Sequence, residues 1–157
     1  MINNLIALPT GYCLVTGRGD DEFPLCAFDQ ALCMAGLGGT NLVRLSSTLN
    51  PNAIMSDLPS FHPGGLVAVA YAHATSAFAG QQIAAAIALV RPSNRRSEGV
   101  IMEWGGNAST QQAERRVIAM AEKAMQIRQI CDFSTEVCSI ELYPAKIGCC
   151  FAAVVQF

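Results

Sequence analysis

The sequence has 157 residues, of which 52% are hydrophobic and 14% charged, and a formal net charge of −2. This length predicts a single domain over residues 1–157, and a charged fraction below the roughly 25% of an average domain indicates surface hidden in an oligomer. Without a basic stripe or an apolar run of about 18 residues, we expect neither nucleic acid nor a membrane as a partner.

The seven cysteines favour a reducing compartment. No C-x-x-C pair occurs, which excludes the usual zinc and thioredoxin-type sites, so most of these residues are expected to be small apolar side chains. The segment Met1–Asn4 lacks the basic start of a secretory signal, and we expect a cytoplasmic protein. A reactive thiol at Cys26 remains an alternative.

The first third of the chain predicts a strand, a loop and a helix. Residues 12–16 form the strand, and residues 17–22 form a polar loop. The loop's Gly-x-Gly lacks the third glycine of a nucleotide-binding motif. Pro24 suits the first turn of a helix, Gly36 is its stop, and four apolar residues lie between them at helical spacing: Leu25, Phe28, Leu32 and Ala35.

The remaining elements are mostly strands. We expect them over residues 40–46, 66–75, 83–90, 99–104, 136–142 and 149–157, with a proline-broken loop over residues 50–65. One helix is predicted over residues 110–129, because Ser109 and Gln112 form a capping box. Its apolar residues recur at helical spacing: Ala113, Val117, Met120, Ala124 and Ile127.

Alanine alternates with larger residues in two of the predicted strands. Residues 68–75 carry alanine at every even position, and so do residues 83–89. Alternate residues of a strand share a face, and alanine is a poor strand former, so close packing of two sheets through these small faces would explain both patterns. We therefore predict an α+β fold, a four-layer α/β/β/α sandwich with helices on the outer faces. A helix over residues 83–90 is the alternative.

Ser46 and Ser47 follow the strand over residues 40–46, and a serine pair can be a site of backbone self-cleavage. A serine hydroxyl pressed against the preceding carbonyl can attack it to give an ester. β-Elimination then breaks the chain and leaves dehydroalanine, which hydrolyses to a pyruvoyl group. Most serine pairs are solvated turns, so this pair gains its significance from the blocks around it.

Three blocks give the sequence its resemblance to a known family. They are Pro24-Leu25-Cys26-Ala27-Phe28-Asp29, the stretch from Asn41 to Ser47, and Gly99-Val100-Ile101-Met102-Glu103. In this order, over about residues 15–153, the sequence resembles the pyruvoyl-dependent arginine decarboxylases. The likeness implies the sandwich described above and conversion of L-arginine to agmatine and CO2.

By this resemblance, Ser47 would become the pyruvoyl group after cleavage between Ser46 and Ser47, which gives chains 1–46 and 47–157. Its carbonyl would form a Schiff base with the substrate amine and accept the electron pair left by CO2. No metal and no pyridoxal phosphate would be needed, and Lys123 and Lys146 are the only lysines. The histidines His62 and His73 are too sparse for a metal or triad site.

Two residues are candidates to act beside Ser47. Regular alternation places Asn41 on the same face as Ser47 and Arg44 on the other, so we expect Arg44 in a structural or interface role. The family implies that Asn41 assists processing and lines the site; a solvated strand-edge amide is the alternative. Glu103 interrupts an apolar strand, which favours a protonated carboxyl, and the resemblance makes it the proton donor. The alternative is a strand-end carboxylate in water.

The resemblance also implies a substrate-recognition site on the first helix. Asp29 would bind the cationic end of the substrate, for which a carboxylate paired with a guanidinium is suited, and Leu25 would line the same pocket. By pattern alone, Asp29 is a solvated helix residue. The family assembles as homotrimers of cleaved protomers with sites between subunits, so we expect Asp29 and Leu25 across a subunit boundary from Ser47 and Glu103.

Several positions depart from the family pattern. They include Phe23 and Cys26, the stretch 48–50 after the serine pair, and the pair Gln81-Gln82. Because these changes surround the pocket and the cleavage loop, two alternatives stay open. One is a pyruvoyl-dependent decarboxylase of another amino acid; the other is a homologue that does not cleave and serves as a structural or regulatory partner.

Overall fold

The computed structural model describes residues 8–157, so the segment Met1–Asn4 lies outside its described part. These residues form two helices and nine strands, which confirms the mixed α+β class. The helices are α1 (Pro24–Met34) and α2 (Thr110–Ile127). The strands are β1 (Gly11–Asp21), β2 (Asn41–Arg44), β3 (Thr48–Leu49), β4 (Ile54–Met55), β5 (Leu66–Ser76), β6 (Ile83–Pro92), β7 (Gly99–Gly106), β8 (Phe133–Leu142) and β9 (Ile147–Gln156).

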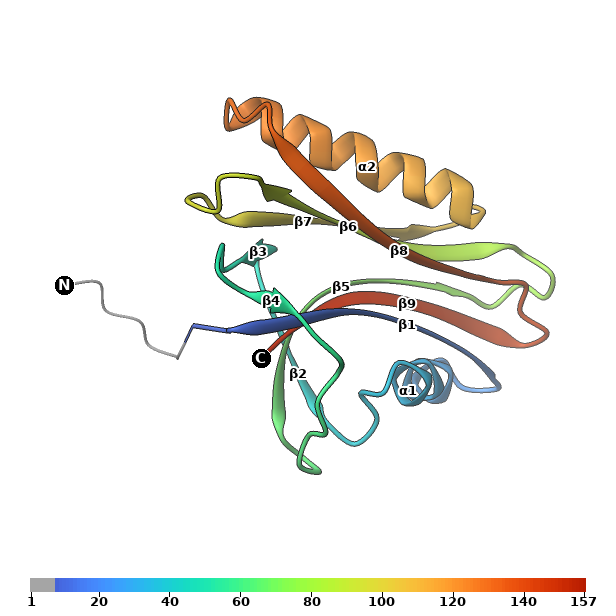
Figure 1. Cartoon of the computed structure of the whole chain (residues 1–157). Coiled ribbons are helices and arrows are strands. Elements are labelled where there is room, and N and C mark those ends of the chain that lie inside the picture. The colour runs from blue at the N-terminus through green and yellow to red at the C-terminus, as the bar shows by residue number, and fades with distance from the viewer. Residues whose placement is uncertain (1–7) are drawn as a thin grey trace.

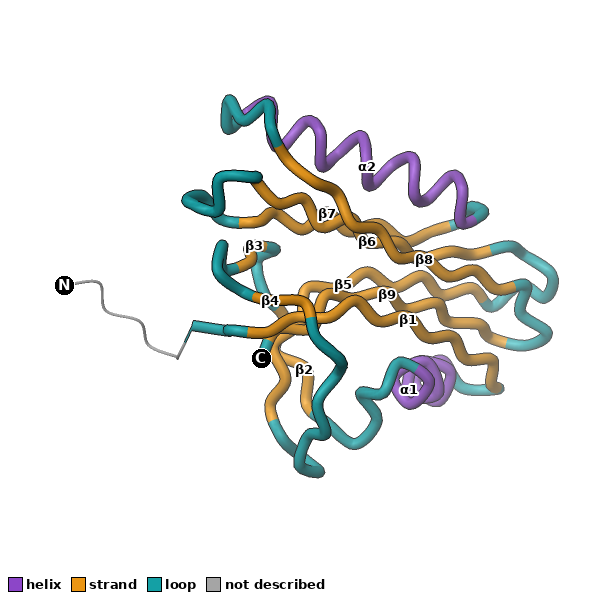
Figure 2. Tube along the Cα trace, viewed as in Figure 1, coloured by secondary structure: helices purple, strands orange, loops and turns teal. Residues whose placement is uncertain are grey.

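The strands form two sheets that face each other. One sheet has the order β2-β5-β9-β1-β4 and the other β3-β7-β6-β8. Helix α1 lies on the outer face of the first sheet and α2 on the outer face of the second (Figure 1). Figure 2 shows the two strand layers stacked between the helices, and a continuous apolar core fills the space between the sheets.

The two alanine-rich strands use their small faces differently. In β5, Ala70, Ala72 and Ala74 face the other sheet, as the sequence predicts. In β6 the prediction is wrong, because Ala84, Ala86 and Ala88 pack beneath α2. The opposite face of β6, which packs against the other sheet, carries Ile83, Ala85, Ile87 and Leu89. Small side chains on one sheet therefore meet large ones on the other, which keeps the layer between them filled.

Helix α1 docks through small residues together with most of the predicted stripe. Ala27 and Ala31 are fully buried. Phe28, Leu32 and Ala35 of the stripe pack against the same core, whereas Leu25 is 76% exposed. The reason for the burial of Ala27 and Ala31 lies in β1: a Cβ atom on Gly17 or Gly19 would overlap the backbone carbonyls of Ala31 and Ala27. The Gly-x-Gly of this segment therefore allows a helix to lie close against a strand.

Most predicted elements are confirmed, and two details differ: the stretch 17–21 and the α2 stripe. Residues 17–21 continue β1 instead of forming a loop, because each of them pairs with β9. Residues 83–90 lie in a strand as predicted, so the helical alternative is wrong. The capping box of Ser109 and Gln112 is present. Met120 and Ile127 of the predicted α2 stripe are exposed, and buried Ala121 and Met125 complete the stripe instead. Neither helix of residues 8–157 is long and apolar enough to cross a membrane.

Candidate active site

The serine pair lies on a tight connection between two sheets. Strand β2 ends at Arg44, and β3 begins at Thr48 in the opposite sheet. Ser47 has a φ of 68°, in the left-handed region that costs a residue with a side chain about 1–2 kcal/mol. Hydrogen bonds hold both sides of the pair: the Leu45 N–H donates to the Val69 carbonyl at 2.8 Å, and the Ile101 N–H to the Ser47 carbonyl at 2.9 Å. The backbone is thus held in a strained geometry at the proposed cleavage site.

The hydroxyl of Ser47 meets the carboxylate of Glu103. Ser47 Oγ donates to Glu103 Oε2 at 2.8 Å. Glu103 lies on β7, and its side chain is only 19% exposed. A carboxylate at this distance can accept the hydroxyl proton and so activate Ser47 as a nucleophile. The alternative of a fully solvated strand-end carboxylate does not hold.

Arg44 also belongs to this cluster, which the sequence did not predict. Its Nη2 lies 3.4 Å from Glu103 Oε1 and 3.2 Å from the Tyr71 carbonyl, and its guanidinium lies 4.7 Å from the Tyr71 ring centroid. The alternation argument failed because β2 stops at Arg44 and Ser47 turns into the left-handed region. Residues 44 and 47 therefore reach the same carboxylate.

A cavity of about 310 Å³ opens beside the serine pair. It is large enough for part of an amino acid, and its wall combines polar groups with apolar side chains of β7 and α2. Its lining residues are Ser46, Ser47, Thr48, Val100, Ile101, Met102, Glu103, Met120 and Arg128. The residues fit a carbonyl group formed at position 47, because that position reaches both the cavity and a partly buried proton acceptor.

Asn41 contacts a different group from the predicted one. Its Nδ2 donates to the Gly64 carbonyl at 2.8 Å, beside the point where β2 begins to pair with β5. This bond ties the 62–65 turn to the start of the strand that leads to Ser47. In this structure Asn41 thus anchors the start of β2, the strand that precedes the serine pair.

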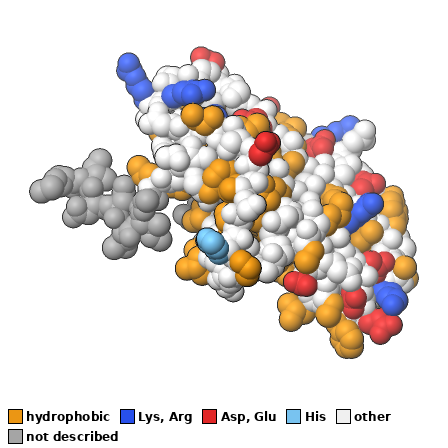
Figure 3. Space-filling model, turned by 60° about the horizontal axis from the view of Figure 1, so that its bottom comes forward, with side chains coloured by type: hydrophobic (Ala, Val, Ile, Leu, Met, Phe, Trp, Pro, Cys, Tyr) orange, Lys and Arg blue, Asp and Glu red, His pale blue; other side chains and the backbone are white. Residues whose placement is uncertain are grey.

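Leu25 and Asp29 lie apart from this cavity. Both are exposed on α1, outside the five-stranded sheet, and neither lines the cavity beside Ser47. Figure 3 shows apolar and acidic side chains, with a few basic ones among them, on the face of the molecule that carries α1. Within one chain the predicted recognition residues and the serine pair are therefore not brought together.

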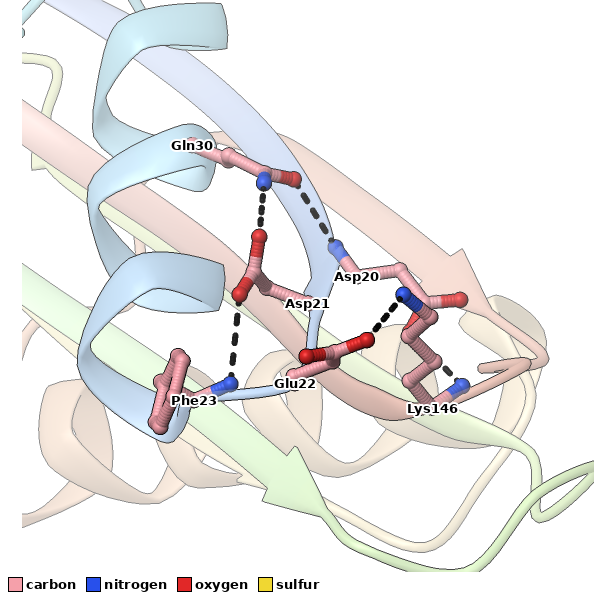
Figure 4. Close-up of polar contacts among 6 residues, drawn as sticks. All are labelled: Asp20, Asp21, Glu22, Phe23, Gln30 and Lys146. Atoms are coloured by element: carbon pink, nitrogen blue, oxygen red, sulfur yellow. Dashed lines mark hydrogen bonds and ion pairs between the residues drawn. The ribbon is translucent and has the colours of Figure 1, made fainter.

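The orientation of α1 is set by a polar network at its start (Figure 4). Asp21 accepts from the Phe23 N–H at 3.2 Å and from Gln30 Nε2 at 2.8 Å, and Glu22 pairs with Lys146 at 3.1 Å. Such contacts fix the first turn of the helix against the ends of β1 and β9. They hold Leu25 and Asp29 facing away from the protomer.

The buried cysteines of residues 8–157 are poor candidates for a second reactive centre. Burial raises the pKa of Cys13 to about 11 and of Cys138 to about 12, so these thiols are inert at neutral pH. Burial lowers the pKa of His73, with a smaller contribution from the charge of Arg44. Cys26 is exposed on α1. Within residues 8–157 no group of three His, Cys, Asp or Glu side chains is placed to hold a metal ion.

Comparison with known proteins links this geometry to one family. The family model described as Pyruvoyl-dependent arginine decarboxylase (PvlArgDC) matches residues 11–157. Three relatives carry the name pyruvoyl-dependent arginine decarboxylase. The protein of Methanocaldococcus jannaschii is 39% identical over 93% of this chain and 88% of its own length. Those of Methanococcus aeolicus and Methanococcus vannielii are 36% and 38% identical, over 93% and 92% of this chain and 88% of their own lengths.

Proposed function

Because the chain belongs to the pyruvoyl-dependent arginine decarboxylase family, we propose that it converts L-arginine to agmatine and CO2 with a pyruvoyl group made from Ser47. The observation that carries this assignment to a residue is the 2.8 Å hydrogen bond from Ser47 Oγ to Glu103. The family favours this function over decarboxylation of another amino acid and over a homologue without activity.

Self-cleavage begins with the hydroxyl of Ser47. Its oxygen attacks the carbonyl carbon of Ser46 and its proton passes to Glu103. The bond from that carbon to the Ser47 nitrogen breaks, and the nitrogen takes up a proton, which leaves an ester. Loss of the Ser47 Cα proton then expels the Ser46 carboxylate, which keeps the former Oγ. Water finally replaces the nitrogen, which leaves as ammonia, and chains 1–46 and 47–157 result.

In the mature site, Glu103 has a second task. The keto group at position 47 supplies an electron sink for the pair left behind by CO2. Glu103 stays beside that position, only 19% exposed and paired with Arg44. From there its carboxyl group can deliver a proton to the substrate Cα after CO2 has left. We propose that one carboxyl group takes a proton during cleavage and gives one during turnover.

We propose that a neighbouring subunit completes the site with Asp29 and Leu25, in a homotrimer. The α1 face exposes Phe23 and Leu25 with nearby carboxylates. Next to the Ser47 cavity, a groove of about 730 Å³ shares its lining residues Met102, Met120 and Arg128. The wall of this groove is largely apolar and also carries cationic side chains: Arg115, Arg116, Lys123 and Arg128. The two surfaces are complementary in charge and in apolar content, which supports the contact.

Two broader proposals complete the picture. The three apolar layers, between the sheets and under each helix, support description of the whole fold as a four-layer α/β/β/α sandwich. All seven cysteines are unpaired, and we propose that the enzyme works in the reducing cytoplasm.

The intact mass of the purified protein, combined with a substrate panel, tests the function. We expect two chains that divide between residues 46 and 47, a hydrazine-reactive carbonyl on the larger one, and CO2 release from arginine. If the protein released CO2 from a different amino acid and not from arginine, the proposed substrate would be wrong and the pyruvoyl chemistry would stand. An uncut chain without the carbonyl would overturn the function.

Mixed oligomers test the subunit boundary. Ser47→Ala protein lacks the reactive group and Asp29→Ala protein lacks the guanidinium partner, so neither should turn over arginine well alone. Coexpressed in one oligomer, they should regain activity above both, because intact Ser47 of one subunit meets intact Asp29 of the next. A mixture of Ser47→Ala and Glu103→Ala proteins is the control and should not recover. Failure of the first mixture would place Asp29 outside the shared site.

A further inference from the structure

A partly buried polar cluster outside the active site consists of Tyr12, Arg91 and Glu136. Arg91 Nη1 donates to Tyr12 Oη at 2.9 Å, and Tyr12 Oη donates to Glu136 Oε1 at 2.8 Å. The Arg91 guanidinium also lies 5.2 Å from the Tyr12 ring centroid. Tyr12 is 1% exposed, and Glu136 Oε2 is buried without a hydrogen-bond partner. Taking charged groups even partly out of water is costly unless their hydrogen bonds are complete, and here one carboxylate oxygen lacks a partner.

The cluster holds the segment that follows the serine pair. Arg91 Nη2 donates to the Ala53 carbonyl at 2.8 Å and to the Pro51 carbonyl at 3.3 Å. Both carbonyls lie in the turn between β3 and β4. These strands have two residues each, so their regular pairing with β7 and β1 is short. Charged hydrogen bonds to two carbonyls therefore add substantially to the anchoring of this segment.

Cleavage changes what this segment requires. In the uncut chain, Ser47 is held by covalent bonds on both sides. In the cut chain, residues 47–56 are an N-terminal segment, and chain termini fray unless they are tied down. The group at position 47 is the reactive one, and a displacement of about 1 Å can cost about 10²-fold in rate.

We propose that Arg91, buttressed by Tyr12 and Glu136, is a positioning residue that keeps the N-terminal segment of the larger chain in place after cleavage. The inference rests on the proposed processing at Ser47. It also explains the arrangement of the cluster, since Tyr12 belongs to chain 1–46 whereas Arg91 and Glu136 belong to chain 47–157. These three residues, with the contacts of Arg91 to the Pro51 and Ala53 carbonyls, are called the clamp, and the clamp therefore joins both cleavage products. Burial and the bond to Glu136 raise the pKa of Tyr12, so its hydroxyl stays protonated as a donor.

Arg91→Met tests the clamp, with Arg96→Met in the neighbouring turn as the matched control. We expect Arg91→Met to cut within about threefold of the parent rate, because the intact chain still holds Ser47 from both sides. Its kcat per hydrazine-reactive carbonyl should fall at least about tenfold, with little change in KM. Hydrogen exchange at amides 48–56 should speed up, while exchange in α2 stays as in the parent. The Arg96→Met protein should match the parent throughout.

Two results would overturn the proposal. One is a cut Arg91→Met protein with the parent's kcat per carbonyl and the parent's exchange at residues 48–56. The other is faster exchange in α2 to the same degree, which would mean a general loss of stability. Should Arg91→Met fail to fold, Tyr12→Phe and Arg91→Lys decide: we expect about threefold losses of kcat, and parent-like values in both would equally overturn the clamp. A parent protein without a reactive carbonyl would instead refute the proposed function.

Discussion

The two predicted halves of the site differ in how they are built. Around Ser47, hydrogen bonds from three elements fix a nucleophile, a carboxylate and a guanidinium within one chain. On α1, Leu25 and Asp29 are exposed and have no such surroundings. The protomer thus holds together the groups proposed to make and use the reactive carbonyl, whereas the groups proposed to recognise arginine would gain a pocket only from the proposed neighbouring subunit.

This difference predicts that changes at the two ends affect different quantities. Changes around Ser47 should alter chain cleavage and kcat, because those steps use bonds already formed in the protomer. Changes on α1 should alter KM and assembly, and they should leave cleavage intact. Each of the following experiments can break or sharpen that division.

Ser47→Ala should have the largest effect, complete loss of cleavage and of turnover. The variant lacks the attacking hydroxyl, so denaturing electrophoresis should show one chain and hydrazine should label none of it. Ser46→Ala is the matched control, since position 46 supplies only its backbone carbonyl. We expect that variant to cut. Cleavage of the Ser47→Ala protein at the same bond would contradict the assignment.

Glu103→Gln should slow both steps, by about 10²–10⁴-fold for turnover. The amide can still contact Ser47 and Arg44, but it cannot take up or deliver the proton. Cleavage half-times and kcat per carbonyl measure the two roles separately. Glu122→Gln, on the exposed face of α2, controls for the loss of a charge. Normal cleavage with poor turnover would restrict Glu103 to the second role.

Asp29→Asn should leave cleavage unchanged and raise KM for arginine about 10–100-fold, because a charged hydrogen bond contributes about 1.5–3 kcal/mol. Steady-state kinetics on fully cut protein measures this. Asp132→Asn, an exposed change elsewhere, should keep the parent's KM. A lowered kcat at unchanged KM would mean that Asp29 acts in the chemical step, which contradicts the proposed separation of recognition from catalysis.

Gly17→Ala should have the smallest effect, about 1–3 kcal/mol of unfolding free energy. The new methyl group would overlap the Ala31 carbonyl, so α1 must move away from β1. Denaturant titration of uncut Ser47→Ala protein, with and without the change, measures the loss. Leu66→Ala, at an exposed position, should stay within about 0.5 kcal/mol. An equally small effect of Gly17→Ala would mean that the helix contact is loose.

The sequence predicted the elements well where local patterns are strong. The helix capped by Ser109 and the alternation in residues 66–75 both hold. The sequence did not predict which layer each face of a strand contacts. In β6 the face with Ala84, Ala86 and Ala88 packs against α2, and the face with Ile83 and Ile87 packs against the opposite sheet. Periodicity separates two faces of a strand, but it does not name the neighbour of each.

The candidate site shows the same limit. Short motifs single out Ser47 and Glu103, and the family resemblance places both in one site. The hydrogen bond between them, across 56 positions, agrees with that prediction. Arg44 was placed on the wrong face because alternation assumes a regular strand, and a left-handed residue ends that regularity. The clamp by Arg91 carries no local sequence signal, since its partners lie 38 to 79 positions away.

The position of β1 has a consequence for the life of the molecule. This strand lies between β9 and β4, so a product ending at residue 46 would be interleaved with the rest of the sheet. Once cut as proposed, the two pieces could separate only by dismantling that sheet, and renaturation would become a second-order reaction that slows on dilution. The uncut polypeptide would then fold as one chain, whereas the cut protein, once unfolded, could refold only by association of its two chains.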